Sequence, residues 1–138
     1  MKYQNSVIIP INNKVKETYN SPENLNLGYD KNPKLIFNRI LKCLERKDRM
    51  DVLLKITGKN NETFWTKNTF YKDQNTINVI VEDYNNQSVI KKVNKLYSNL
   101  IKIENNISSA YANKYLDGYL ETEHITLCKI ISHFLQSA

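Results

Sequence analysis

Residues 76–103, TINVIVEDYNNQSVIKKVNKLYSNLIKI, decide the fold of this chain, because a strand pattern and a helix pattern stand back to back in them. Ile77, Val79 and Val81 alternate with their neighbours, which is the period of a strand with one buried face. Asn86 can then cap a helix. In that helix apolar residues recur at helical spacing, namely Val89, Val93, Leu96, Tyr97, Leu100 and Ile101. The stretch predicts a sheet packed with amphipathic helices.

The residues before this stretch extend it into a meander. Residues 52–57 and 62–71 are rich in β-branched and aromatic side chains and are separated by a turn cluster at 58–61, so they predict two further strands. Pro33 can open a helix with apolar residues at Ile36, Phe37, Ile40, Leu41 and Leu44. Residues 6–11 predict a first strand that Pro10 confines to an edge or a strand end. Residues 15–19 can return as a second strand, and residues 20–32 predict a surface loop.

After the central helix, the sequence predicts more helix. Ile107, Tyr111 and Tyr115 recur four residues apart, and Asp117-Gly118 then interrupts the pattern. Thr122 can cap a final helix, in which the apolar face is made by His124, Leu127, Cys128, Ile131, Phe134 and Leu135. The chain is therefore expected to be a single α+β domain over residues 1–138. Its antiparallel sheet should have about five strands, in the order ββαβββαα.

Length and composition set the class of protein. The 138 residues are 41% hydrophobic, which is enough for one core, and no apolar run is long enough to span a membrane. The apolar run near the N-terminus is too short for a secretory signal. The net charge is +6, but the lysines are spread along the whole chain, which is typical of a solvated basic surface. These features favour a cytoplasmic protein.

Residues able to carry chemistry are few and scattered. Cys43 and Cys128 form no metal or redox spacing, so we expect two buried free thiols in a reducing compartment. His124 and His133 have no further ligand at metal-binding spacing, and the three glycines lie too far apart to form a phosphate-binding loop. The sequence therefore predicts no enzyme activity, no metal and no cofactor.

The strand at 62–71 carries more aromatic surface than one sheet face needs. If Phe64 fills the core, alternation places Trp65 at least partly outside it, together with Lys67. We therefore predict a protein interface at Trp65, Tyr71 and Lys67. Two alternatives stay open: a helix of the same chain covers Trp65, or the aromatic and basic residues form a platform for single-stranded nucleic acid.

Several stretches resemble the longin-like small chains of vesicle coats, the sigma chains of clathrin adaptors and the zeta chain of coatomer. Phe70-Tyr71-Lys72, the strand TINVIVEDY and the helix after Asn86 resemble the central passage of that family. The segment YLDGYLET at 115–122 resembles the segment before its final helix. The loop at 20–32, the short stretch between residues 103 and 117, and Pro10 depart from the family pattern.

The resemblance implies a non-enzymatic protein-binding subunit in intracellular transport. Its partner would be a larger helical-solenoid coat chain, and it would meet vesicle or Golgi membranes only through that complex. It implies no small-molecule substrate. Two alternatives remain: a basic nucleic-acid-binding domain, and a small inhibitor or immunity-type protein of a mobile element or virus.

Overall fold

The computed structural model describes residues 6–10, 28–58, 61–73 and 76–136. The chain is a single α+β domain, which confirms the predicted class, and it contains two compact units that are interleaved along the sequence. One unit holds the sheet and includes residues 44–85. The other is helical and consists of residues 32–43 and 86–138.

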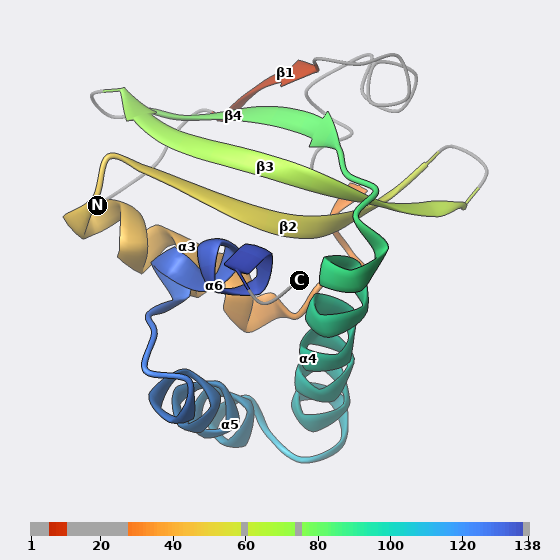
Figure 1. Ribbon diagram of the computed structural model, residues 1–138, viewed down its shortest axis with the longest axis vertical. Coiled ribbons are helices and arrows are strands. Elements are labelled where there is room, and N and C mark those ends of the chain that lie inside the picture. The colour runs from red at the N-terminus through yellow and green to blue at the C-terminus, as the bar shows by residue number, and fades with distance from the viewer. Residues whose placement is uncertain (1–5, 11–27, 59–60, 74–75, 137–138) are drawn as a thin grey trace. The chain divides into compact units, whose positions relative to one another are not determined.

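Three consecutive strands form the predicted antiparallel meander. In the sheet, β2 pairs with β3 and β3 pairs with β4, both antiparallel, while β1 joins the free side of β4 in parallel (Figure 1). The strands are β1 (Ser6–Pro10), β2 (Arg49–Thr57), β3 (Thr63–Asp73) and β4 (Thr76–Asp83). Short connections between antiparallel neighbours explain why this part of the fold follows directly from the sequence.

The expected count of about five strands is wrong, because the sheet has four strands in the part of the chain that the structure describes. The second strand expected at residues 15–19 lies outside the described residues. The placement of Pro10 is confirmed, since it is the last residue of β1 and β1 is an edge strand of the described sheet. An edge suits proline because it has no N–H to donate to a ladder.

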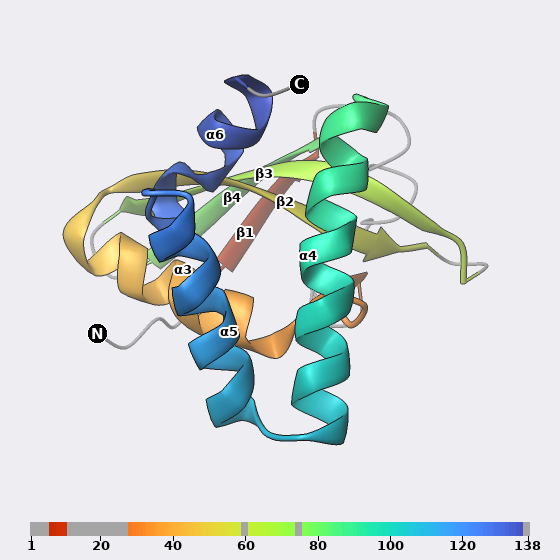
Figure 2. The ribbon, with the colours of Figure 1, turned by 60° about the horizontal axis from the view of Figure 1, so that its bottom comes forward.

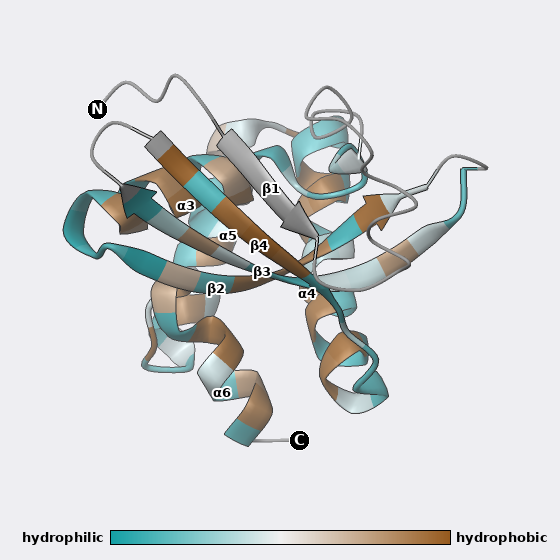
Figure 3. Ribbon diagram, turned by 90° about the horizontal axis from the view of Figure 1, so that it is seen from above, coloured by the Kyte–Doolittle hydropathy of each residue, from teal (hydrophilic) through white to brown (hydrophobic). Residues whose placement is uncertain are grey.

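One face of the meander is apolar and buried, and we call it the apolar face. It is formed by alternate residues of the three strands, in keeping with the period of two. Figure 3 shows that much of β4 is coloured hydrophobic. The buried apolar side chains of this face are Met50, Val52, Leu54, Ile56, Phe64, Phe70, Ile77, Val79 and Val81.

The apolar face also holds a small polar network in which the buried groups are hydrogen-bonded. Asn68 donates from Nδ2 to Thr66 Oγ1 at 2.9 Å, and Thr66 donates to the backbone oxygen of Leu54 at 3.0 Å. Tyr29, which is buried, donates its hydroxyl proton to Asn68 Oδ1. Buried polar groups are tolerated when they are paired in this way.

The helical unit contains long helices and a short terminal one (Figure 2). Its elements are α3 (Lys34–Arg46, of which residues to Cys43 belong to this unit), α4 (Gln87–Asn106), α5 (Ser109–Thr122), the 3₁₀ turn η2 (Leu127–Lys129) and α6 (Ile130–Gln136). α4 packs against α5 and against α6. The predicted stripe on α4 is buried at Val89, Val93, Leu96, Tyr97 and Leu100. Within the described residues, no helix is long and apolar enough to cross a bilayer.

Asn86 caps α4 as predicted. Its side-chain oxygen accepts a hydrogen bond from the backbone N–H of Val89. We expect Asn86→Ala to lower the free energy of unfolding by about 0.5–2 kcal/mol, because it leaves that N–H without its side-chain acceptor. Asn86→Asp is the matched control, since aspartate keeps the acceptor and its charge suits a helix N-terminus. Equal loss in both variants, measured by urea unfolding, would show that the cap does not stabilise the helix.

The end of the chain differs from the prediction in two places. Asp117-Gly118 does not interrupt the helix, because α5 runs through both residues with Leu116 and Leu120 buried on either side. Glycine in a helix interior costs only about 1 kcal/mol, which burial of two leucines offsets. Thr122 is the last residue of α5 and not a cap, and helix resumes only at Leu127. His124 has a positive φ of 56°, which lies outside the right-handed helical region, so the helix does not continue through this residue.

The prediction of two free thiols is wrong. Cys43 of α3 and Cys128 of η2 form a disulfide, with their Cα atoms 6.0 Å apart and their positions separated by 85 in the sequence. Both residues belong to the helical unit. The two cysteines are brought together by the packing of helical segments that are far apart in sequence. Their spacing in the sequence therefore does not predict the disulfide.

Candidate protein interface

The three residues predicted as an interface lie on one face of β3. Trp65, Lys67 and Tyr71 are separated by even numbers of residues in an unbroken register with β2, so they point away from the apolar face. All three are half-buried. We call this side of the meander the mixed face. It consists of Arg49, Asp51, Leu53, Lys55, Thr57, Thr63, Trp65, Lys67, Thr69, Tyr71, Asn78, Ile80 and Glu82.

Trp65 lies beneath a lysine of the neighbouring strand. Lys55 is its register partner on β2, and the Lys55 Nζ is 5.4 Å from the centroid of the tryptophan ring. A cation over an aromatic face is attracted by the quadrupole of the ring. Burial lowers the pKa of Lys55. The ring and the ammonium therefore form one amphipathic unit on the mixed face.

Side chains of both charges stand on the strands around this unit. Lys67 lies between Leu53 of β2 and Glu82 of β4 in the register, and Tyr71 lies between Arg49 and Asn78. Opposite charges on directly opposed strand positions favour the pairing of the strands. Leu53 and Thr69 of this face are buried, and the Thr69 hydroxyl donates to Asp51 at 2.7 Å. The aromatic and charged side chains around them contribute to the accessible surface of the mixed face.

Trp65 is neither a fully buried core residue nor a fully exposed one. Period-two alternation predicted its direction correctly, since Phe64 beside it is buried. The stacking of Lys55 was missed, because it depends on the register between β2 and β3. That Trp65, Lys67 and Tyr71 anchor a partner stays a prediction.

A second exposed surface, on α5, was also missed. Tyr111 and Tyr115 of this helix are 52% and 37% exposed, and Ile107, which caps the C-terminus of α4, is 64% exposed, although the three recur at helical spacing. The buried side of α5 is made by Ala112, Leu116 and Leu120 instead. The sequence shows two apolar stripes on this helix and gives no sign of which one faces inward.

Neither histidine is part of a metal centre in the described structure. His133 of α6 lies 3.2 Å from Glu123 through its Nε2 atom, an ion pair when the imidazole is protonated. Elsewhere in the helical unit, Arg39 pairs with Asp117 at 2.6 Å. Among the described residues, no three His, Cys, Asp or Glu side chains are grouped as metal ligands would be.

Comparisons of the chain with protein-family models, with curated proteins and with solved structures found no match.

Proposed function

We propose that this chain is a non-enzymatic protein-binding domain whose partner docks on the mixed face around Trp65. The observation that carries the proposal is the half-buried tryptophan under Lys55, flanked on the same strand by Lys67 and Tyr71. Tryptophan and tyrosine are the residues that most often anchor interfaces, because they desolvate a large area with few rotatable bonds.

The charges on the mixed face support a protein partner. The three strands present Lys55 and Lys67 together with Asp51 and Glu82, and Lys67 is directly opposite Glu82. A partner protein can present the complementary arrangement of charges. Such complementarity contributes to the specificity and orientation of binding more than to its affinity.

The finer form of the proposal is a longin-like small chain of a vesicle coat, which binds a larger helical-solenoid chain in the cytoplasm and reaches membranes only through it. The order strand, helix, three strands, long helix and further helices supports this form. The disulfide weighs against it, because the cytosol keeps thiols reduced. The broader proposal of a protein-binding domain does not depend on the compartment.

The redox state of the two cysteines in the native source separates these forms. Thiols would be blocked with an alkylating reagent on lysis, before reduction and labelling with a second reagent. A disulfide places the second label on Cys43 and Cys128 and favours a binding domain of an oxidising compartment. The first label on both residues favours the coat form.

Two alternatives are tested by simple measurements. A nucleic-acid-binding domain is supported by two lysines and two aromatic rings on the mixed face, at Lys55, Lys67, Trp65 and Tyr71. Phosphate contacts make binding fall steeply with salt, whereas a protein interface of mixed charge is much less sensitive.

An inhibitor or immunity-type protein would be stable and monomeric when purified alone, whereas a coat chain would need its large partner.

We expect Trp65→Ala to weaken binding of the partner by about 2 kcal/mol or more, while the free energy of unfolding changes little. The reason is that the exposed part of the ring is available to a partner and only the rest packs on the sheet. Titration calorimetry and urea unfolding measure the two quantities. Tyr111→Ala is the matched control, because it removes an aromatic ring that is 52% exposed on α5. If Trp65→Ala unfolds the protein and binding follows only the folded fraction, the ring belongs to the core.

A further inference from the structure

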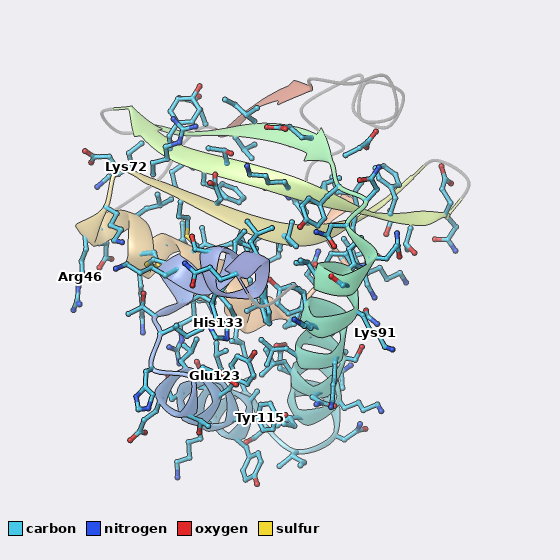
Figure 4. All side chains as sticks on the ribbon, viewed as in Figure 1. Arg46, Lys72, Lys91, Tyr115, Glu123 and His133 are labelled. Atoms are coloured by element: carbon cyan, nitrogen blue, oxygen red, sulfur yellow. A yellow bond between two sulfur atoms is a disulfide. The ribbon has the colours of Figure 1, made fainter. Side chains whose placement is uncertain are left out.

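A groove of about 530 Å³ lies within the helical unit, lined by α4, α5 and α6. Its volume falls in the range of small-molecule sites, roughly 300–1,000 Å³. Figure 4 labels three of the side chains at the groove, Tyr115 of α5, Glu123 at its C-terminal cap and His133 of α6. The groove shares no residue with the mixed face.

One wall of the groove is basic. Lys92 and Lys95 are three residues apart on α4, so they lie on the same side of the helix, and both line the groove. The carboxylate in the lining, Glu123, lies 3.2 Å from His133. The lining therefore contains two ammonium groups and one carboxylate, and that carboxylate is next to an imidazole. The net charge of the lining is positive.

The tyrosines of α5 add hydroxyl groups to the lining. Tyr115 Oη accepts a hydrogen bond from Asn99 Nδ2 at 3.1 Å, which leaves the phenol proton of Tyr115 to donate to a ligand. The pKa of Tyr119 is raised mainly by burial and further by the nearby Glu123 and Tyr115. Its phenol therefore stays protonated at neutral pH and is also a donor.

The floor of the groove is apolar. Leu96 of α4 and Phe134 of α6 line it and are each only 3% exposed. An apolar floor between cationic and phenolic walls suits a ligand that has one anionic end and an apolar body. A hydrophilic anion such as free phosphate would place its polar oxygens against this apolar floor. Such a contact is unfavourable because the oxygens would lack hydrogen-bond partners there.

We propose that this groove binds an amphiphilic carboxylate, a carboxylic acid on an apolar chain of medium length. The carboxylate lies between Lys92 and Lys95, with a phenol of α5 donating to it. The chain lies over Leu96 and Phe134. This site is independent of the protein interface proposed above.

The test uses decanoate, decanol and decylammonium, which share one chain and differ in the head group. Each is titrated below its micellar concentration into the full chain with its disulfide intact. Binding is followed by calorimetry and by chemical shifts of the Leu96 methyl groups. We expect decanoate to bind about tenfold or more tightly than decanol, and decylammonium to bind weakest. Equal binding of decanoate and decanol, or no binding of decanoate, would overturn the proposal.

The double variant Lys92→Met and Lys95→Met removes both charges and keeps the aliphatic stems. Two partly exposed ion pairs contribute about 0.2–1 kcal/mol each, so decanoate affinity should fall about two- to thirtyfold. Decanol affinity should stay unchanged. Lys91→Met is the matched control, because Lys91 is an exposed lysine of α4 outside the groove lining. An equal loss with Lys91→Met would mean that net charge alone attracts the anion, and the site would be wrongly placed.

Discussion

Replacing both Cys43 and Cys128 by alanine is expected to lower the free energy of unfolding by about 4–5 kcal/mol. The two residues are 85 positions apart, so the disulfide closes a long loop and removes much chain entropy from the unfolded state. The loss is a large fraction of the stability of an average domain, which is about 5–15 kcal/mol. Urea unfolding followed by circular dichroism measures it from the midpoint and the slope.

Reduction of the unaltered chain is the control for this variant. Dithiothreitol should lower the unfolding midpoint by a similar amount, and it should leave the double alanine variant unchanged. A loss below about 1 kcal/mol in both experiments would contradict the disulfide as a main stabiliser of the helical unit. A difference between the loss on reduction and the loss in the alanine variant would report how much the packing of the two cysteine side chains contributes to stability. Such a contribution is expected because Cys43 is buried.

Leu100→Ala is expected to lower the free energy of unfolding by about 2–5 kcal/mol, the range for truncating a buried leucine. Leu100 is fully buried on the apolar stripe of α4, so the substitution removes apolar contacts and leaves a cavity. The matched control is Ile107→Ala at the end of the same helix, where the side chain is 64% exposed. That control should change stability by no more than about 0.5 kcal/mol.

The comparison of these two variants tests which side chains of α4 are packed. If Ile107→Ala destabilises as much as Leu100→Ala, the side chain at the end of α4 is packed in solution. If Leu100→Ala loses less than about 1 kcal/mol, the face of α4 is not part of a core.

The central strand and helix were predictable because their periods are local. Ile77, Val79 and Val81 are buried as the alternation requires, and Asn86 caps α4 where the helical period starts. The meander followed from short turns between strands. Each of these features depends on residues that are neighbours in sequence, where propensity and pattern agree.

Features set by distant contacts were missed. The disulfide joins Cys43 to Cys128 across 85 residues, and no local pattern reports it. Gly118 reads as a helix breaker, but nothing lies near its missing side chain and burial of its neighbours sustains α5. Leu41 belongs to the predicted stripe of α3 and yet is 38% exposed, because the helix turns Leu35 and Cys43 inward.

The candidate interface was predictable in part. Alternation along β3 gave the direction of Trp65 and Lys67, because a strand has only two faces. The lysine over the ring, Lys55, is set by the register between β2 and β3, which neither strand shows on its own. The groove of the helical unit was not predictable, since its lining comes from three helices whose packing angles no single helix encodes.

Site-specific photo-crosslinking tests the central claim, that a protein partner docks on the mixed face. A benzophenone amino acid would replace Lys67 on that face or, as a control, Tyr111 on α5. The chain would then be irradiated in its native extract, with Trp65 intact and with Trp65→Ala. We predict one recurring protein adduct from position 67 that Trp65→Ala abolishes and that position 111 does not form. Equal adducts from both positions, or an adduct that persists with Trp65→Ala, would contradict the proposed interface.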